Sequence, residues 1–106
     1  MNKYNNTWCE YAGKKFQSRK EMEYAMFLDS EQQAGRIHRY NTQVKFPIEI
    51  NGKKVFTYVL DFEIINKDDT IRYVDIKGYK GGPAYQMFRL KKKCTEAMYG
   101  ITIEEL

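Results

Sequence analysis

The dipeptide Asn51-Gly52 lies between two segments with the residue pattern of β-strands, and no other feature limits the fold as strongly. On its N-terminal side, apolar residues alternate with more polar neighbours at Val44, Phe46, Ile48 and Ile50. The segment 55–65 on its other side is rich in β-branched and aromatic residues. Because Asn-Gly favours the tight turn of a β-hairpin, the sequence predicts two antiparallel strands joined here.

A helix is predicted before this hairpin, over residues 19–33. Ser18 and Glu21 have the spacing of a capping box, and Gly35 supplies a stop signal. The stretch 37–40 is then expected to begin the strand that leads into the hairpin.

After the hairpin, a third strand is predicted over residues 71–76, a helix that ends at Gly100, and a short strand over residues 101–103. Apolar residues recur at helical spacing in this helix, and we expect them to pack inside: Met87, Leu90, Cys94, Ala97 and Met98. Met22 and Met26 of the first helix are likewise expected in the core. Arg89, Lys92 and Lys93 would form a basic face that points elsewhere.

The order helix, three strands, helix, strand predicts an α/β or α+β fold in which helices flank a central mixed sheet. A length of 106 residues supports one hydrophobic core, so we expect a single domain over residues 1–106. Residues 1–17 would form an N-terminal arm or a short hairpin.

The net charge of +4 permits a polyanionic partner without requiring one. No apolar run reaches the length of a membrane span, and the start of the chain is polar, so we expect a cytoplasmic protein without membrane contact. Cys9, Cys94 and His38 are too few and too scattered to predict a zinc site.

Two carboxylates stand inside predicted strands, at Asp61 and Asp75. Side chains alternate along a strand, so Asp75 and Lys77 share a face as an acid and base pair. If the loop between the strands has an odd length, either 67–69 or 66–70, Asp61 lies directly opposite Asp75. Like charges in that position repel each other, and a divalent cation between them converts repulsion into coordination.

The first helix supplies a third acid, because Glu21 shares a face with Ala25 and Leu28 and therefore points toward the core. Hard oxygen ligands without His or Cys favour Mg²⁺, with Mn²⁺ as a substitute, over zinc. The sequence thus predicts a magnesium site formed by a helix and two strands.

The stretches GKKFQSRKE, NTQVKFPI, YVLDF and VDIKG, with the basic helix after the glycine loop, cover most of the chain from Gly13 onward. Together they resemble the PD-(D/E)xK nuclease superfamily, and within it a group of small phage-encoded endonucleases similar to Holliday-junction resolvases. The resemblance implies a restriction-endonuclease-like core. Two positions depart from the family pattern: Leu60 stands where a proline is frequent, and Asp75 replaces the more frequent glutamate.

The resemblance implies a catalytic set of Glu21, Asp61, Asp75 and Lys77. Metal ligands would be Asp61, Asp75, the carbonyl of Ile76 and Glu21. Lys77 would position the attacking water or offset charge on the phosphate. The implied activity is Mg²⁺-dependent hydrolysis of DNA phosphodiester bonds, selective for Holliday junctions or branched DNA, in phage recombination or genome processing in the host cytoplasm.

Contacts to DNA are predicted for basic and polar residues that can displace counterions from the backbone. These are Arg36, Arg39, Gln43, Lys80, Arg89, Lys91, Lys92 and Lys93. Because a junction needs two symmetric cuts, the resemblance also implies a homodimer.

Other interpretations of the same residues stay open. Glu21 is explained equally by capping alone, and Asp75 and Lys77 by a solvent-facing ion pair. The run 91–93 has the composition of a solvated helix face. At the level of function, the alternatives are a general or nicking nuclease, a catalytically inactive nucleic-acid-binding or regulatory module, and a protein-interaction module with structural acids.

Overall fold

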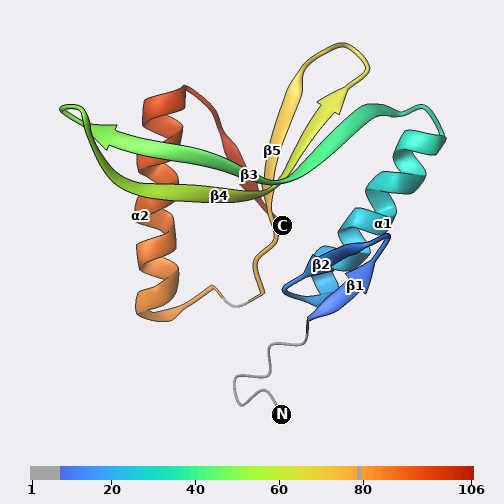
Figure 1. Ribbon diagram of the computed structural model, residues 1–106, viewed down its shortest axis with the longest axis horizontal. Helices are drawn as coiled ribbons and strands as arrows, with labels where there is room; N and C mark the ends of the chain where they lie inside the picture. Colours follow the sequence, from blue (N-terminus) through green and yellow to red (C-terminus); the bar gives the residue numbers. More distant parts are fainter. Residues whose placement is uncertain (1–7, 79) are drawn as a thin grey trace.

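The computed structural model describes residues 8–78 and 80–106, and within them it has an α+β architecture. A mixed sheet has the strand order β3-β4-β5-β6, and β1 and β2 form a separate hairpin (Figure 1). The elements are β1 (Cys9–Tyr11), β2 (Lys14–Phe16), α1 (Arg19–Gln33), β3 (Ile37–Ile50), β4 (Lys53–Asn66), β5 (Ile71–Asp75), α2 (Gly82–Tyr99) and β6 (Ile103–Glu105). The predicted α+β class, with a mixed sheet of four strands and two helices, is therefore confirmed.

The hairpin at Asn51-Gly52 is present and joins β3 to β4, each 14 residues long. Both turn residues have positive φ angles, 52° and 77°, as a tight hairpin turn requires. β3 is one continuous strand, but Gln43 interrupts its regular pairing with a φ of 53°. Its flanking residues pair with Phe62 and Leu60, so Gln43 lies opposite Asp61.

The loop between β4 and β5 settles the register that the sequence left open. Ile65 pairs with Ile71, so five residues, 66–70, form the loop. The ladder continues to Phe62 and Val74 and then stops. Asp61 and Asp75 follow directly, at the point where the two strands diverge. They are opposite in register, as expected for an odd loop, but they lie just beyond the regular ladder.

β6 pairs in parallel with β5, which makes the sheet mixed. It begins at Ile103 and not at residue 101 as predicted. The reason is local: the amides of Gly100 and Ile101 both donate to the carbonyl of Glu96 at the end of α2. Ile103 is the first residue of β6, and its amide donates to the Glu96 carboxylate at 2.7 Å.

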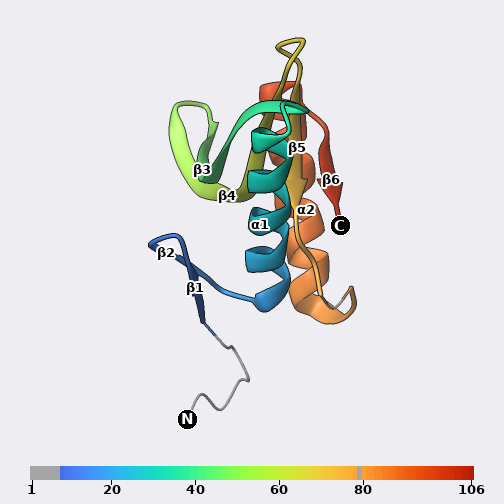
Figure 2. The ribbon, with the colours of Figure 1, turned by 90° about the vertical axis from the view of Figure 1, so that its right-hand side faces the viewer.

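α1 has the predicted bounds and the predicted buried face. The Ser18 hydroxyl accepts a hydrogen bond from the Glu21 amide at 3.1 Å, and Glu21, Ala25 and Leu28 are buried. The core on this side also contains Phe16, Ile37, Phe62, Ile64, Val74 and Ile76. Figure 1 places α1 and α2 on opposite sides of the region where β3, β4 and β5 meet, and in the side view α1 lies in front of α2 (Figure 2).

The predicted inner face of α2 is wrong. Met87, Leu90 and Met98 are 53%, 57% and 47% exposed, and Met26 of α1 is also exposed. The helix instead turns Phe88, Lys92 and Thr95 toward the body of the protein, and Thr95 is fully buried. Hydrogen bonds decide this orientation, because Lys92 and Tyr85 both donate to the carboxylate of Glu105 in β6.

The predicted N-terminal arm contains the β1–β2 hairpin, and its residues 1–7 lie outside the described residues. Tyr11 and Tyr40 donate to the two oxygens of Asp29, at 2.5 and 2.6 Å, and this joins the hairpin to α1 and β3. Across residues 8–78 and 80–106, neither helix has the length and apolar character of a membrane span.

Candidate functional site

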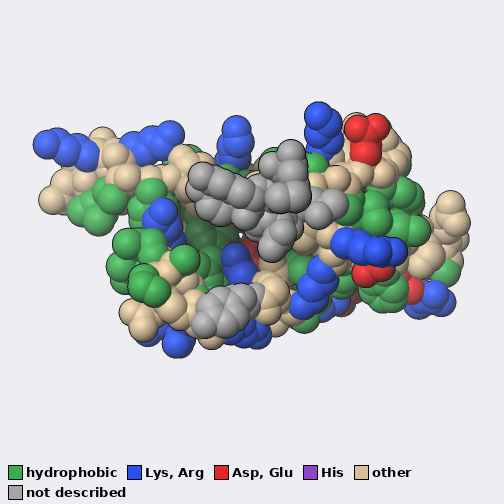
Figure 3. Space-filling model, turned by 90° about the horizontal axis from the view of Figure 1, so that it is seen from below, with side chains coloured by type: hydrophobic (Ala, Val, Ile, Leu, Met, Phe, Trp, Pro, Cys, Tyr) green, Lys and Arg blue, Asp and Glu red, His purple; other side chains and the backbone are tan. Residues whose placement is uncertain are grey.

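A pocket of about 330 Å³ lies where β4 and β5 diverge, and it receives side chains from both helices. We call it the central pocket. Its lining residues are Gln17, Glu21, Gln43, Thr57, Tyr58, Val59, Asp61, Asp75, Ile76, Lys77, Phe88 and Lys91. Seen from below, the molecule is hollowed between its two helical parts, with Lys and Arg side chains on both sides of the hollow (Figure 3). The four residues predicted to be catalytic therefore line one pocket.

Asp61 and Asp75 are linked through backbone amides. The Asp61 amide donates to Oδ1 of Asp75 at 2.9 Å, and the Ile76 amide donates to Oδ2 of Asp61 at 2.9 Å. The Tyr58 hydroxyl donates to Oδ2 of Asp75, whose side chain is only 2% exposed. Each carboxylate thus satisfies an amide at the end of the ladder, which holds both acids in a defined orientation.

The pocket is electrostatically unfavourable for several ionised acids. Burial raises the pKa of Asp61 to about 7, the Ile76 amide opposes this rise, and the charges of Asp75 and Glu21 add to it. Burial also raises the pKa of Glu21, with the backbone hydrogen bond at Gln17 and the charge of Lys77 opposing the rise. A cation in the pocket would therefore stabilise the ionised acids.

Lys77 is held by contacts from three elements. Its Nζ lies 3.7 Å from the centroid of the Phe88 ring of α2. Its carbonyl accepts a hydrogen bond from Lys20 of α1 at 3.0 Å, and its amide donates to the Leu106 carbonyl at 2.9 Å. The cation is placed over an aromatic face, an attraction that limits its movement.

The donor atoms of the central pocket fit a hard divalent cation in kind. The three acids that line it, Glu21, Asp61 and Asp75, offer carboxylate oxygens, and its described lining contains no His or Cys. Within residues 8–78 and 80–106, however, no three His, Cys, Asp or Glu side chains are arranged so that they could hold a metal ion together. Both Asp75 oxygens accept hydrogen bonds, so we expect the acids to rearrange around a cation.

The residues predicted to contact DNA are divided between several surfaces. Gln43 and Lys91 line the central pocket. Arg89 and Lys93 line a separate hollow on the outer side of α2, and Lys80 is exposed in the loop before that helix. Arg39 is exposed on β3, with a long contact of 3.5 Å to Asn41.

Two of these basic residues are already paired. Arg36 bonds to Glu31 at 2.6 Å, at the end of α1. Lys92 bonds to Glu105 at 2.8 Å and is largely buried. The prediction that Lys92 belongs to an outer basic face is therefore wrong, because its partner is on the sheet beneath the helix.

Five lining residues of the central pocket were missed by the sequence analysis, and two of them, Tyr58 and Phe88, contact predicted site residues. Strand alternation places Tyr58 on the face opposite to Asp61, yet its hydroxyl reaches Asp75 because the acids lie beyond the regular ladder. Phe88 falls outside the apolar stripe assigned to α2. An additional signal was present in the spacing of Tyr85, Phe88, Lys92 and Thr95, but a stripe of this mixed composition does not stand out from sequence alone.

The family model described as "Protein of unknown function (DUF1064)" matches residues 1–102. The chain belongs to this family. The match covers α1, the whole of β3 to β5 and α2, and therefore every lining residue of the central pocket. No curated protein and no solved structure matches the chain. The DUF1064 family description assigns no activity, and the central pocket is the feature of the chain that bears on its function.

Replacement of Tyr58 by Phe tests how the pocket is held together. We expect Tyr58→Phe to lower the free energy of unfolding by about 1–3 kcal/mol, because a buried Asp75 oxygen loses its donor. Tyr99→Phe is the matched control, since the Tyr99 hydroxyl donates to the Pro47 carbonyl at an exposed site. Urea unfolding followed by circular dichroism measures both. Equal effects in the two variants would contradict this assignment.

Proposed function

We propose that the protein is a metal-dependent DNA endonuclease of the PD-(D/E)xK type. The observation that carries this proposal is the convergence of Glu21, Asp61, Asp75 and Lys77 on one pocket, from α1, β4 and the end of β5. Two of the acids have pKa values raised by burial, and a cation bound between them would favour their ionised forms. The sequence motifs that carry these residues add to this support.

In the proposed site, Asp61, Asp75, Glu21 and the carbonyl of Ile76 hold Mg²⁺. Bound Mg²⁺ supplies Lewis-acid stabilisation of the phosphate and activation of water. The chain's own contribution is the placement of charge. Lys77, fixed over Phe88, offsets negative charge that accumulates on the scissile phosphate. Glu21, whose pKa is raised by burial, would add a carboxylate oxygen to that Mg²⁺ ion or to a second one.

The proposed substrate is branched DNA, and the proposed assembly is a homodimer that makes two symmetric cuts. Lys91 lines the central pocket and is placed to neutralise a phosphate there. Arg39, Lys80, Arg89 and Lys93 are exposed and available for more distant backbone contacts. Lys92 takes no part in the proposed DNA surface, because it is held by Glu105. Arg36 is exposed and would have to share its charge with Glu31.

Cleavage assays with labelled four-way junction, flap and linear duplex DNA test this function. We expect Mg²⁺-dependent cutting, strongest on the junction, and no cutting in the presence of a chelator. Lys77→Ala is expected to reduce the rate by at least about a hundredfold, the scale found for removal of one charge-stabilising group. Lys67→Ala is the matched control, because Lys67 lies in the exposed β4–β5 loop. If every substrate stays intact with both Mg²⁺ and Mn²⁺, the nuclease proposal is wrong.

A second candidate is a nucleic-acid-binding module without catalysis. Two observations favour it. Both oxygens of Asp75 already accept hydrogen bonds. Within the described residues, no three His, Cys, Asp or Glu side chains are grouped closely enough to hold a metal ion. This candidate predicts junction binding in gel-shift assays that is independent of Mg²⁺ and insensitive to substitution of Asp61.

A further inference from the structure

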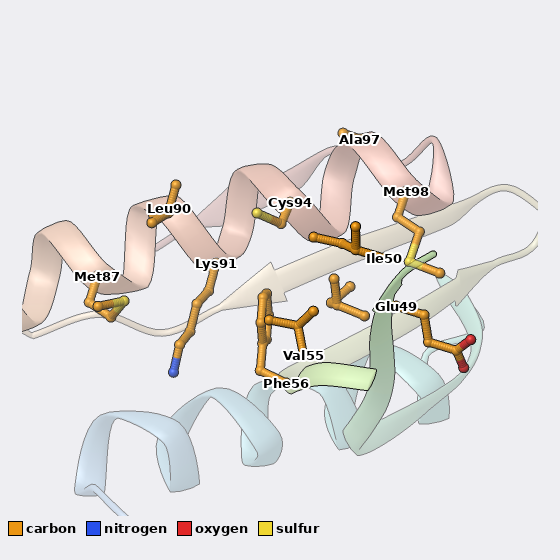
Figure 4. Close-up of a pocket in the computed structure, with 11 residues that line it drawn as sticks. Glu49, Ile50, Val55, Phe56, Met87, Leu90, Lys91, Cys94, Ala97 and Met98 are labelled. Carbon is orange, nitrogen blue, oxygen red and sulfur yellow. The ribbon is translucent and has the colours of Figure 1, made fainter. Parts of the chain in front are cut away.

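An apolar groove of about 710 Å³ runs between α2 and the tip of the β3–β4 hairpin. It is lined by Ile48, Glu49, Ile50, Val55, Phe56, Met87, Leu90, Lys91, Cys94, Ala97 and Met98. The close-up shows Cys94 and Met98 of the helix beside Ile50 of the hairpin (Figure 4). The groove is distinct from the central pocket, with which it shares only Lys91.

The groove exposes large apolar side chains from both of its walls. Ile50 and Val55 of the hairpin are 60% and 55% exposed, and Leu90 of α2 is 57% exposed. Met87 and Met98 continue the exposed stripe along the helix. Scattered exposed apolar residues are ordinary, but a contiguous lined groove of this kind marks a binding surface.

The orientation of α2 explains why this stripe stays uncovered. The helix is turned by the bonds of Tyr85 and Lys92 to Glu105, which place its polar residues against the sheet. Its regular apolar stripe consequently points along the hairpin. Within residues 8–78 and 80–106 no element covers it.

Basic side chains border the groove. Lys91 lies in its wall, and Lys53 and Lys54 are the strand partners of Ile50 and Glu49. Arg89 and Lys93 flank Leu90 in the adjoining hollow. Glu49 is the one acid that lines the groove. A symmetric pairing of two copies through this surface would bring equal basic borders together, which is unfavourable. Charge complementarity instead requires an acidic occupant.

The floor of the groove is aliphatic and sulfur-rich, with Phe56 as its one aromatic residue. Nucleic-acid bases bind by stacking on aromatic rings, so this floor suits them poorly. Aliphatic and methionine side chains instead accept the apolar anchors of an amphipathic helix, because Met adapts its shape to different partners. Acidic residues on both sides of such a stripe would face the basic borders.

We propose that this groove binds an acidic amphipathic helix of a partner protein. The occupant has apolar anchors at helical spacing, which fill the space between Leu90 and Val55, and carboxylates that face Lys53, Lys54 and Arg89. The proposal does not depend on nuclease activity, since the groove and the central pocket have different linings.

Fluorescence anisotropy with labelled designed peptides of about 18 residues, five helical turns, tests the proposal. The probe carries Leu at positions i, i+3, i+4 and i+7 and Glu at most others. One control peptide has the same composition in scrambled order, and a second replaces Glu by Lys. We expect saturable binding of the probe, weakened by added salt, and binding at least about tenfold weaker for both controls.

Protein variants locate the binding surface. Leu90→Asp and Ile50→Asp, one on each wall, are expected to weaken probe binding by at least about tenfold. Phe27→Asp is the matched control, because Phe27 is 51% exposed on α1, away from the groove, and its replacement should leave binding unchanged. Circular dichroism checks that each variant is folded, and Ile50→Asp carries the test if Leu90→Asp fails to fold.

Four results would overturn the proposal. The first is absence of probe binding, and the second is equal binding of the scrambled peptide. The third is a wild-type dimer in sedimentation equilibrium that Leu90→Asp converts to a monomer, since a second copy would then cover the groove. DNA binding that competes with the probe and is lost in Leu90→Asp would likewise assign the groove to nucleic acid.

Discussion

Asp61→Asn is expected to reduce Mg²⁺-dependent DNA cleavage by at least about a thousandfold while making the metal-free protein more stable at pH 8. The loss of activity follows from removal of a proposed metal ligand, for which about 4 kcal/mol of transition-state stabilisation corresponds to a thousandfold in rate. The gain in stability follows from the raised pKa of Asp61, since the charged carboxylate is disfavoured in its buried position. Asn keeps an oxygen that can accept from the Ile76 amide.

The size of the stability gain is on the order of 2 kcal/mol, because each unit of pKa shift corresponds to about 1.4 kcal/mol and relaxation reduces the total. Urea unfolding at pH 8 in the presence of a chelator measures it, and junction cleavage measures the rate. Asp69→Asn in the exposed β4–β5 loop is the matched control and should change neither quantity. If Asp61→Asn is more stable but the wild-type protein does not cut DNA, the acids have a structural role. If Asp61→Asn keeps full activity, Asp61 is not part of the active site.

The second large effect is a pH-dependent stability that Mg²⁺ reverses. The pKa of Asp61 is about 7 in the folded protein, above its ordinary value of 3.8. Between these values the folded state binds more protons than the unfolded state, so stability is highest at the acidic end and is lost as the pH rises through 7. We therefore expect the melting temperature of the metal-free protein to fall between about pH 4 and about pH 7, the window that those two values set.

Mg²⁺ at pH 8 should restore the lost stability, because it binds the ionised acids of the folded state alone. At a hundredfold excess over its dissociation constant, binding adds about 2.7 kcal/mol, which is about 10 °C or more in melting temperature for a domain of this size. Differential scanning fluorimetry with Mg²⁺, chelator, and NaCl at matched ionic strength measures this shift. Asp61→Asn should lose the Mg²⁺ response and should have a smaller pH dependence, of which the part that comes from the raised pKa of Glu21 stays. If Mg²⁺ leaves the melting temperature unchanged, the interpretation as a protein-interaction module is favoured.

Much of the fold was predictable because its signals are local. The capping pair Ser18 and Glu21 gave the start of α1, and Asn51-Gly52 gave the hairpin, since each acts through the backbone of a few neighbouring residues. The register of β4 and β5 was predicted only conditionally: an odd loop, 67–69 or 66–70, places Asp61 opposite Asp75, but local signals do not fix whether the loop is odd or even.

The acids of the candidate site were predictable from the sequence, but the residues that contact them were not. Asp61 and Asp75 are conspicuous because carboxylates inside strands are costly, and their convergence follows from register. The contacts that hold them are different in kind. The Tyr58 hydroxyl reaches Asp75 because the two strands diverge there. The Lys77 ammonium lies over the Phe88 ring because α2 packs Phe88 against the cluster of Tyr58, Leu60 and Ile103.

By itself, the sequence determined the order of the elements, their turns and caps, and the chemical character of the acids in the central pocket. Only the tertiary structure decided which side of α2 is buried, and thereby that the apolar groove stays open. The physical reason is range: periodicity and capping depend on residues a few positions apart, whereas the orientation of α2 depends on Lys92 meeting Glu105 of β6 across the fold. The packing of Phe88 against the cluster of Tyr58, Leu60 and Ile103 acts over the same range, and neither contact is visible in the local pattern of Met87, Leu90 and Met98.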